Sequence, residues 1–370
     1  MSVLNESVRP LVWLGIFGVV LVVSTAAGAA QGDHAAAVVN GPIVFVAGPG
    51  SDLFTVRPDG RLLRRLTKGP GVDGDPAWSP NGRTTAFDRT SPNGRVTSVY
   101  LVSTVGGEPR LLVRGARSPG WSPTGRWLAV FRSNAGCPNV GCPNAANVWI
   151  VPLAGGRPRL AVAGAWSAAW SPSGRQLAAM RADGIWIVTL ATGTMRRLTT
   201  ISAKTSLDWS PDGSRLLLVL NDSIVTVSTS DGSSTTLLPP PTPVLEPPRC
   251  TQPSISGPTW SPNGRLIAYQ REDSCAPGSG QPQGTLSIGV IGSDGSDHAG
   301  IGTQNTSYDV GAWFYAWSPD SAQLAFLDDE QDSTGHIYLS VASPFTSTIH
   351  HLNKDADLGT PAWRAAAPTH

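Results

Sequence analysis

The sequence predicts an all-β fold, a β-propeller of four-stranded blades, and three observations lead to this prediction. A phrase close to Trp-Ser-Pro-x-Gly occurs six times, beginning at Trp78, Trp121, Trp170, Trp209, Trp260 and Trp317. Apolar residues alternate with other residues after most copies, as in RWLAVF and RLIAY. Glycine (41) and proline (32) are abundant while charged residues are only 14% of the chain, which favours turns over long helices.

Each copy of the phrase is typical of a hairpin between two short strands. Proline presets φ at the second position of a Ser-Pro-x-Gly turn, and glycine accepts a positive φ at the fourth. The segment that ends in the tryptophan is the first strand, and the apolar alternation after the glycine is the second. A repeated phrase of this kind indicates a structural joint rather than six copies of an active site.

Two further strands follow each joint. The third ends in a glycine-rich turn, as in residues 147–156 and 184–193, and the fourth is short, as in MRRLT. Four strands that recur every 39 to 57 residues between tryptophans are typical of propeller blades. A lone blade could not cover its own faces, so the copies are expected to stack.

The two ends of the repeat region predict how the ring closes. Residues 43–67 contain strands two, three and four of a unit, and the missing first strand is found in residues 360–365, TPAWRA. One blade that takes strands from both termini removes exposed sheet edges. Six complete blades and this composite blade make seven. The alternative of six requires a degenerate unit, for which the unit of Trp260 is the weakest.

The repeated phrase, followed by a strand such as IWIV and an Asp-Gly or Gly-Gly turn, resembles the TolB-like β-propeller repeat. This repeat is a relative of the WD repeat and is also found in the propellers of prolyl-oligopeptidase-type enzymes. The resemblance covers about residues 41–366 and implies the fold. Two departures limit what it implies about function: TolB's N-terminal partner-binding domain has no counterpart, and the peptidases' Gly-x-Ser-x-Gly motif does not occur.

The N-terminal segment, residues 1–30, is predicted to be a signal peptide or a signal anchor. An apolar run at 11–23 follows Arg9, and Ala27-Gly28-Ala29 would suit a signal peptidase. A retained anchor stays open because residues 11–30 carry no charge and could tether the chain to a membrane. Both alternatives predict an extracytoplasmic chain, whether secreted, periplasmic or bound to the cell envelope. Residues 31–40 form a linker, 41–366 the propeller and 367–370 a tail.

The four cysteines lie in the part predicted to be exported, where disulfides persist. Three pairings are possible. We expect Cys250 to pair with Cys275, since both are predicted at one face of one blade, and Cys137 to pair with Cys142. Zinc is disfavoured because CPNVGC has no histidine nearby.

Charge and residue spacing argue against several classes of ligand. A net charge of +1, with no block of like charges, gives no positive electrostatic field that would attract nucleic acid. No histidine has metal-ligand spacing, and the sequence indicates no metal and no cofactor. The seven repeat tryptophans, Trp363 included, are expected to pack blade against blade rather than to form a stacking surface.

The long loops carry the prediction of function. If the strands alternate in direction, the loops from strand two to three and from four to the next blade share one face, which we call the long-loop face. Long loops at 133–146, 239–257, 272–285 and 303–313 all fall there, and loops on rigid scaffolds often bind ligands. Such insertions are also tolerated without function. The candidate binding residues are Asp73, Arg249, Tyr308 and Asp309.

The resulting prediction is an exported, non-catalytic propeller that binds a protein or peptide partner through the long-loop face. One alternative is a propeller enzyme of the lyase or glycosidase type with a site in the central channel. The first strands, which offer mostly Ala, Pro, Ser and Thr, weigh against it. The other alternative is a membrane-tethered sensor module.

Overall fold

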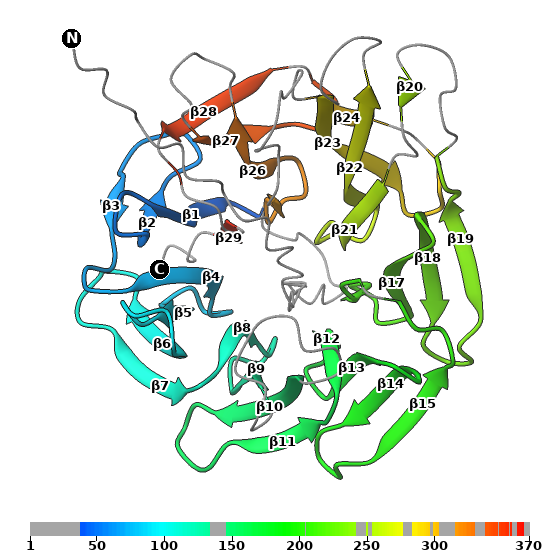
Figure 1. Cartoon of the computed structure of the whole chain (residues 1–370), viewed down its shortest axis with the longest axis horizontal. Helices are drawn as coiled ribbons and strands as arrows, with labels where there is room; N and C mark the ends of the chain where they lie inside the picture. The colour runs from blue at the N-terminus through cyan, green and yellow to red at the C-terminus, as the bar shows by residue number, and fades with distance from the viewer. Residues whose placement is uncertain are drawn as a thin grey trace, which may run out of the picture.

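The computed structural model (Figure 1) describes residues 38–133, 146–203, 205–241, 249–250, 254–276, 283–296, 299–302, 315–329, 337–346, 348–354, 356 and 361–365. These residues form twenty-nine strands and no helix, so no described helix could cross a membrane. The strands make seven antiparallel sheets arranged as blades around one axis. The seven-bladed prediction is confirmed, because the unit of Trp260 forms a complete sheet.

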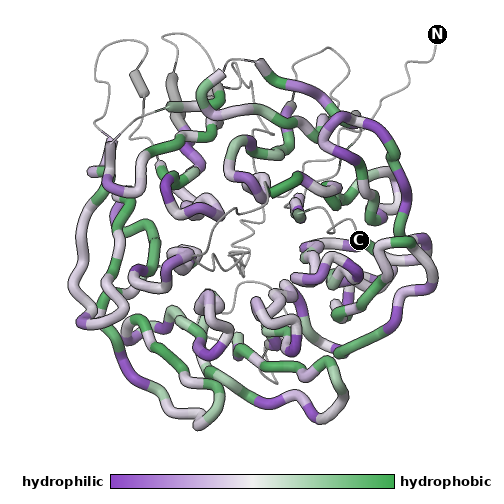
Figure 2. The backbone as a smooth tube through the Cα atoms, turned by 180° about the vertical axis from the view of Figure 1, so that it is seen from behind, coloured by the Kyte–Doolittle hydropathy of each residue, from purple (hydrophilic) through white to green (hydrophobic). Residues whose placement is uncertain are grey.

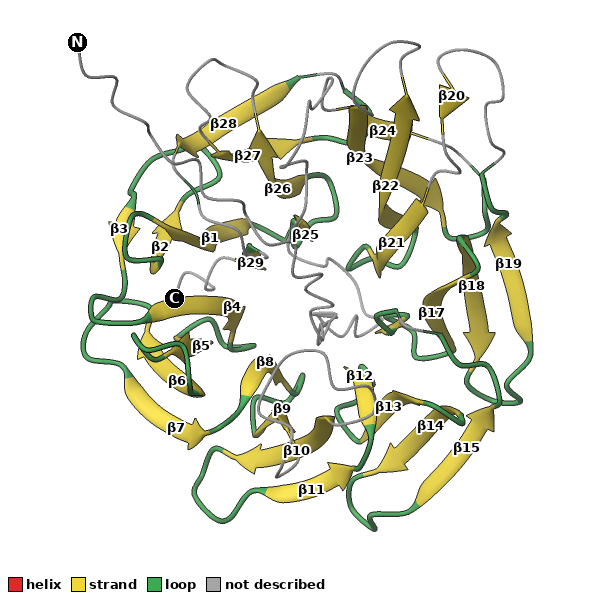
Figure 3. Ribbon diagram, in the orientation of Figure 1, coloured by secondary structure: helices red, strands yellow, loops and turns green. Residues whose placement is uncertain are grey.

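The first three blades, given from inner to outer strand, illustrate the common plan (Figure 3). Blade 1 contains β29 (Ala362–Ala365), β1 (Asn40–Ala47), β2 (Asp52–Val56) and β3 (Arg64–Arg65). Blade 2 contains β4 (Val72–Trp78), β5 (Thr84–Thr90), β6 (Thr97–Ser103) and β7 (Arg110–Arg114). Blade 3 contains β8 (Arg117–Trp121), β9 (Trp127–Ser133), β10 (Ala146–Pro152) and β11 (Arg159–Val162).

The remaining blades keep this order, with one additional strand in blade 6. Blade 4 contains β12 (Ala165–Trp170), β13 (Gln176–Arg181), β14 (Gly184–Thr189) and β15 (Met195–Thr199). Blade 5 contains β16 (Asp208–Trp209), β17 (Arg215–Leu220), β18 (Ser223–Ser228) and β19 (Ser234–Leu238). Blade 6 contains β20 (Arg249–Cys250), β21 (Ser254–Trp260), β22 (Leu266–Ala276), β23 (Gln283–Gly292) and β24 (Ala299–Gly302). Blade 7 contains β25 (Tyr315–Trp317), β26 (Leu324–Asp329), β27 (Ile337–Ala342) and β28 (Ile349–Lys354).

Blade 1 closes the ring with strands from both ends of the chain, as predicted. The C-terminal strand β29 pairs with β1, with Trp363 opposite Ile43. Trp363 Nε1 donates a hydrogen bond to the Gly41 carbonyl at 2.9 Å. The side-chain amide of Asn40 also donates to Asp320 of blade 7 at 2.9 Å. The two ends of the repeat region are therefore held by each other and by the neighbouring blade.

The core consists of seven apolar clusters, one between each pair of adjacent blades. Each cluster contains one repeat tryptophan, and all seven are 2–7% exposed: Trp78, Trp121, Trp170, Trp209, Trp260, Trp317 and Trp363. Hydrophobic segments recur in every blade between hydrophilic turns (Figure 2). The tryptophan that recurs at the same place in each repeat therefore lies at the same place in each interface between blades.

Most repeat tryptophans also bind the preceding blade through the indole N–H. Trp121 Nε1 donates to the Ala77 carbonyl at 3.0 Å, and Trp170 Nε1 donates to the Gly120 carbonyl at 3.1 Å. Trp78 makes the equivalent bond to Ala362 at 3.1 Å, across the ring closure. A buried indole N–H needs an acceptor, and the backbone of the neighbouring first strand supplies it.

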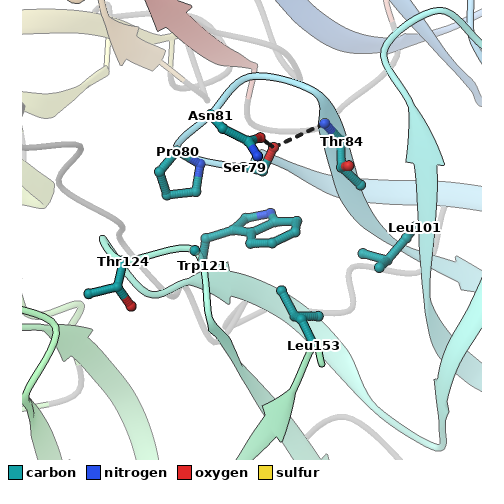
Figure 4. A pocket seen from close by; sticks show the side chains of 9 residues that line it. Ser79, Pro80, Asn81, Thr84, Leu101, Trp121, Thr124 and Leu153 are labelled. Carbon is teal, nitrogen blue, oxygen red and sulfur yellow. Dashed lines mark hydrogen bonds between the residues drawn. The ribbon is translucent and has the colours of Figure 1, made fainter. Parts of the chain in front are cut away.

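The Ser-Pro-x-Gly joints form a second set of contacts between blades. In the joint of blade 2, Gly82 N donates to the Ser79 carbonyl at 2.8 Å, while Ser79 Oγ accepts from Thr84 N at 3.0 Å. Trp121 of blade 3 lies beside Pro80 of this joint, with Leu101 and Leu153 on its other side (Figure 4). The serine and the glycine shape the turn, and the proline packs on the next blade.

The joint glycines lie against the prolines of the preceding blade. A Cβ added at Gly174 would come 3.5 Å from Pro123 Cδ and 3.1 Å from Thr124 Cγ2, in a backbone with φ +65°. Gly193 has a similar φ of +71°, but a Cβ there would meet no atom within 4 Å. Substitution of Gly193 therefore introduces backbone strain alone, whereas substitution of Gly174 introduces the same strain and also crowds the neighbouring blade.

Gly174→Ala is therefore expected to destabilise the protein more than Gly193→Ala. Both substitutions carry the strain of a left-handed residue, roughly 1–2 kcal/mol, and only the first also crowds the neighbouring joint. Urea unfolding of the two variants and the parent measures the difference. Equal losses would show that the contact between joints contributes nothing.

Candidate functional site

The connections between strands differ strongly between the two faces of the disc. The turns on one face include the Ser-Pro-x-Gly joints, such as 79–83 and 261–265. The longest connections, 134–145, 239–248 and 303–314, join second to third strands or one blade to the next. The described strand ends that flank these connections lie at the opposite face, the predicted long-loop face.

Asp73 on β4 is a predicted binding residue, but its side chain has no exposed surface. Its carboxylate accepts hydrogen bonds from Arg89 Nε at 2.5 Å and Arg89 Nη2 at 2.8 Å, a two-pronged ion pair. It also accepts one from Thr67 Oγ1 at 2.6 Å, and Thr67 Oγ1 accepts from Leu53 N at 2.8 Å. The prediction is corrected here: Asp73 ties blade 2 to blade 1 and offers no surface to a partner.

Asp75, Asp88 and Ser118 form a polar cluster between blades 2 and 3. Ser118 Oγ donates to Asp75 Oδ2 at 2.8 Å, and Ser118 N donates to Asp88 Oδ2 at 3.0 Å. Asp75 and Ser118 each lie in a bulge three residues before the repeat tryptophan, with φ of 43° and 48°. The bulges turn one residue of blade 3 toward two carboxylates of blade 2.

The environments of the two carboxylates differ. Asp75 is exposed on β4, one of the innermost strands (Figure 1), whereas Asp88 is only 9% exposed. Burial raises the pKa of Asp88 to about 8, and the nearby Asp75 carboxylate adds to the rise. Burial of its carboxyl group raises the pKa of Asp75 as well, so the pair holds a proton at neutral pH. Such a pair can donate and accept a proton.

Asp208 occupies the inner end of the interface between blades 5 and 6. Its buried carboxylate accepts hydrogen bonds from Trp260 N at 2.8 Å, Thr259 Oγ1 at 3.0 Å and Trp209 N at 2.9 Å. Trp209 Nε1 bonds within its own blade, to Gly213 O at 3.0 Å. Trp260 Nε1 has no hydrogen-bond partner in the described part of the chain. A carboxylate thus replaces the usual indole bond at this interface.

Stability is expected to fall as the pH rises from about 4 to about 7, because burial raises the pKa of Asp208 to about 7 from its usual 3.8. In that window the folded chain binds a proton that the unfolded chain has lost, so unfolding becomes easier as the proton leaves. Asp208→Asn should flatten this part of the profile. Melting temperatures measured at pH 4 to 8 test the assignment, and an unchanged slope in Asp208→Asn would contradict it.

The other predicted site residues lie at or beyond the limits of the described chain. The backbone of Arg249 belongs to β20, whereas Tyr308, Asp309, Cys137 and Cys142 lie outside the described residues. Cys250 lies directly opposite Cys275 in the register of β20 and β22. Opposite residues of antiparallel strands have Cα atoms about 4.5–5.5 Å apart, within the range of about 4.4–6.8 Å that disulfides span. This register supports the predicted pairing of Cys250 with Cys275.

The predicted loop at 272–285 is corrected by the structure. β22 continues to Ala276 and β23 begins at Gln283, and their pairing runs without interruption to Cys275 opposite Gln283. β20 adds a partner to the end of β22, at the periphery of the disc (Figure 3). The sequence here is polar and rich in glycine and proline, with no apolar alternation to mark a strand. The backbone pairing of β22 with β23 continues through this extension, which we call the blade 6 arm (residues 271–276 and 283–287).

The sequence interpretation missed Asp75, Asp88 and Asp208. Asp75 could have been noticed, because Ser118, Ser167, Ser206 and Gly257 hold the equivalent place before the other tryptophans of blades 3 to 6. Asp208 likewise stands where Ala77, Gly120 and Ala169 stand in other blades. A comparison of the copies position by position would have shown both acids as departures from the repeat.

The closed ring, the tryptophan interfaces and the joints define a seven-bladed β-propeller. Its fold is that of the TolB-like β-propellers. TolB from Acinetobacter baumannii matches with a TM-score of 0.52 and 16% identity, over 87% of this chain and 66% of that one. A functionally unknown protein from Desulfotomaculum acetoxidans DSM 771 matches at 0.56 and 12%, over 89% and 99%. Oligogalacturonate lyase from Vibrio parahaemolyticus matches at 0.52 and 14%, over 75% and 80%.

Comparison of the amino-acid sequence alone finds fewer relatives than comparison of the structure does. No family model matches the chain. The uncharacterized peptidase YuxL of Bacillus subtilis (strain 168) is 44% identical over 69 residues, which cover 17% of this chain and 10% of that protein. The chain thus matches only a tenth of this curated relative. The structural matches, at 12–16% identity, show a common fold.

Proposed function

We propose that the chain is an exported β-propeller that binds a protein or peptide partner through its long-loop face, without catalysis. The observation that carries this proposal is the asymmetry of the disc. The joint face has short, repeated turns, whereas the strand ends that flank the longest connections lie at the other face, and the blade 6 arm extends blade 6 beyond the common plan. A rigid ring that varies only on one face is a common design for a binding surface.

The blade arrangement supports binding by a stable rather than a mobile scaffold. Every interface between blades contains a buried tryptophan and its own apolar cluster. The first strands of neighbouring blades also touch, as β4 and β8 do. A rigid ring loses little additional freedom when a partner binds, which favours affinity.

Site-specific photo-crosslinking tests which face the partner occupies. Benzoylphenylalanine would replace Asn93 or Ser254 at the long-loop face, and Asn81 or Asp231 at the joint face. All four residues are exposed. We expect cell-envelope extract to yield one crosslinked partner from Asn93 or Ser254 and none from the joint-face pair. Equal crosslinking at both faces, or none at either, would overturn the proposal.

A second candidate function follows from the Asp75, Asp88 and Ser118 cluster. Two neighbouring carboxyl groups, both with a raised pKa, are an arrangement that sugar-cleaving enzymes use for proton transfer. This observation favours the alternative of a lyase or glycosidase. Neutral and acidic oligosaccharides incubated with the parent and with Asp75→Asn test it by release of reducing ends or unsaturated products. If the parent releases no product from any of these oligosaccharides, this second candidate function is excluded.

A further inference from the structure

We infer that one part of the joint face docks the protein on an anionic lipid membrane. The joint face is the face of the disc that carries the Ser-Pro-x-Gly turns, and the part concerned belongs to blades 7, 1 and 2. The inference goes beyond the proposed function, because it concerns the face opposite to the long-loop face. It is carried by exposed apolar side chains, by the arginines beside them and by the point where the chain enters the ring.

Four large apolar side chains are exposed on three neighbouring blades of the ring (Figure 1). Each lies in the turn between the third and fourth strands of its blade. Because neighbouring strands are antiparallel, these turns share a face with the turns between first and second strands. Exposed apolar residues that gather in this way mark a contact with a partner or a membrane. The four side chains are 51–72% exposed: Leu62 and Leu63 of blade 1, Val105 of blade 2 and Phe345 of blade 7.

The turn of blade 1 contacts both of its neighbours. Arg64 Nη2 donates a hydrogen bond to the Val105 carbonyl of blade 2. On the other side, a Cβ added at Gly60 would come 3.9 Å from Leu352 Cδ2 in β28 of blade 7, the strand that follows Phe345. The apolar side chains of the three turns therefore belong to one stretch of the rim.

Leu62 is unfavourable for the fold in two respects. Its φ of 57° lies in the left-handed region, which costs free energy for a residue with a branched apolar side chain and suits glycine or asparagine better. Its side chain is also 72% exposed. Blade 1 has two residues here, Leu62 and Leu63, where the corresponding turn of blade 4 has one, Met195. The additional leucine contributes little to packing, which points to a contact outside the protein.

Arginines flank the two leucines. Residues 57–65 read RPDGRLLRR, with four exposed arginines. Asp59 and the buried Asp52 each pair with one of them, which leaves two positive charges in excess. The corresponding turns of blades 5 and 6, across the ring, instead expose the acids Asp231 and Asp294. The joint face is therefore basic and apolar on one side and acidic on the other.

This combination fits an anionic lipid surface. Guanidinium groups interact with negatively charged headgroups, while leucine and phenylalanine side chains enter the boundary with the acyl chains. The apolar side chains belong to the turns of three blades, so a partner has to contact several separate projections at once. A lipid surface accepts such projections without matching their shape, whereas a protein interface requires shape complementarity.

The chain also enters the ring on this face. β1 is the second strand of blade 1 and begins at Asn40, whose side-chain amide bonds to Asp320 in the first turn of blade 7 at 2.9 Å. Val38 and Val39, directly before it, are exposed. If the apolar run at 11–23 is retained in a membrane, it is connected to the propeller on the face that we assign to the membrane.

Photo-crosslinking to lipid tests the inference with the full chain. Vesicles of phosphatidylglycerol and phosphatidylcholine in equal parts are compared with vesicles of phosphatidylcholine alone. Because an anchor at 11–23 could hold the chain on both, the readout has to be local to the rim. Benzoylphenylalanine would replace Leu63 or Phe345, with Leu160 on β11 and Asp231 as exposed controls. We expect lipid adducts at Leu63 and Phe345 on the anionic vesicles, fewer at high salt, and few at the controls.

Substitution of the leucines gives a second readout. Leu62→Asn suits the left-handed backbone, and together with Leu63→Ser it removes the apolar surface. With benzoylphenylalanine at Phe345, we expect this double variant to form lipid adducts about tenfold less than the parent, the effect of withdrawing apolar side chains from lipid. The matched change Leu160→Thr, at another exposed leucine, should stay within about twofold of the parent. Equal melting temperatures would show that the loss is not caused by unfolding.

If the double variant fails to fold, the exposed arginines provide the same test. Arg57→Gln and Arg61→Gln keep the apolar surface and remove positive charge. We expect each to reduce the adducts at Phe345 on anionic vesicles by about fivefold, the effect of one basic residue near an anionic surface. On phosphatidylcholine alone the two variants should match the parent.

Four outcomes would overturn the inference. Equal adducts at the rim and at the controls would mean that the membrane is held by another part of the chain. Equal adducts on the two kinds of vesicle would exclude anionic lipid. Protein adducts at Leu63 without vesicles would make a second copy, or the chain itself, the occupant. An unchanged yield in the folded double variant would show that the leucines do not contact lipid. None of these outcomes affects the proposed function, which crosslinking at Asn93 and Ser254 tests separately.

Discussion

Removal of residues 361–370 is expected to abolish cooperative folding or to lower the melting temperature by about 5 °C or more. The truncation deletes β29, so blade 1 loses its inner strand and the ring loses its closure. It removes the buried Trp363 and the carbonyl of Ala362 that accepts the Trp78 indole N–H. It also removes Arg364, whose guanidinium lies 4.8 Å from the Trp78 ring centroid.

The size of this effect follows from the tryptophan alone. Loss of one large buried aromatic costs about 3–5 kcal/mol, and whole domains are stable by only about 5–15 kcal/mol. The exposed edge of β1 adds a liability for aggregation. A truncation after Ala365 is the matched control, because it retains all of β29. Equal melting temperatures of the two truncations, measured by circular dichroism, would contradict the closure described here.

Trp121→Ala is expected to destabilise the protein by about 3–5 kcal/mol, as large core aromatics do. The indole is 4% exposed between blades 2 and 3 and packs with Val99, Leu101 and Leu128. Its Nε1 bond to Ala77 would be lost together with the packing. Since every interface between blades contains one such tryptophan, the loss weakens the whole ring and not one blade.

Trp186→Ala is the control for this substitution. Trp186 is half-buried on β14, where its ring lies 5.2 Å from the Arg181 guanidinium and its Nε1 donates to Asp183 at 3.0 Å. Because the ring is partly solvated, we expect a loss of about 1 kcal/mol, within the range of exposed cation–π contacts. Urea unfolding measures both variants. If Trp121→Ala lowers the free energy of unfolding by no more than Trp186→Ala does, the repeat tryptophans do not have the packing role described here.

The sequence by itself predicted the order of the blades and the closure of the ring, and it favoured seven blades over six. These features depend on local chemistry that repeats: a serine that accepts a backbone N–H, a proline with preset φ, and a glycine at positive φ. Even the copy that lacks the glycine keeps the turn, since Ser321 adopts a φ of 65° and bonds to Ser318 O at 2.8 Å. The composite blade was predictable because each end of the repeat region lacks what the other supplies.

Only the tertiary structure decided which polar residues meet. Asp75 and Ser118 are 43 positions apart, and a bulge in each first strand turns them toward each other. Asp73 is an acid near a predicted loop in sequence, but in the fold Arg89 and Thr67 enclose it. The blade 6 arm also escaped prediction, because its sequence is polar and rich in glycine and shows no hydrophobic alternation. The conformation of a turn depends on the few residues within it and can be predicted from them. The burial of a side chain, the pKa of an acid and the pairing of a strand depend on residues that are distant in sequence and come together only in the closed ring.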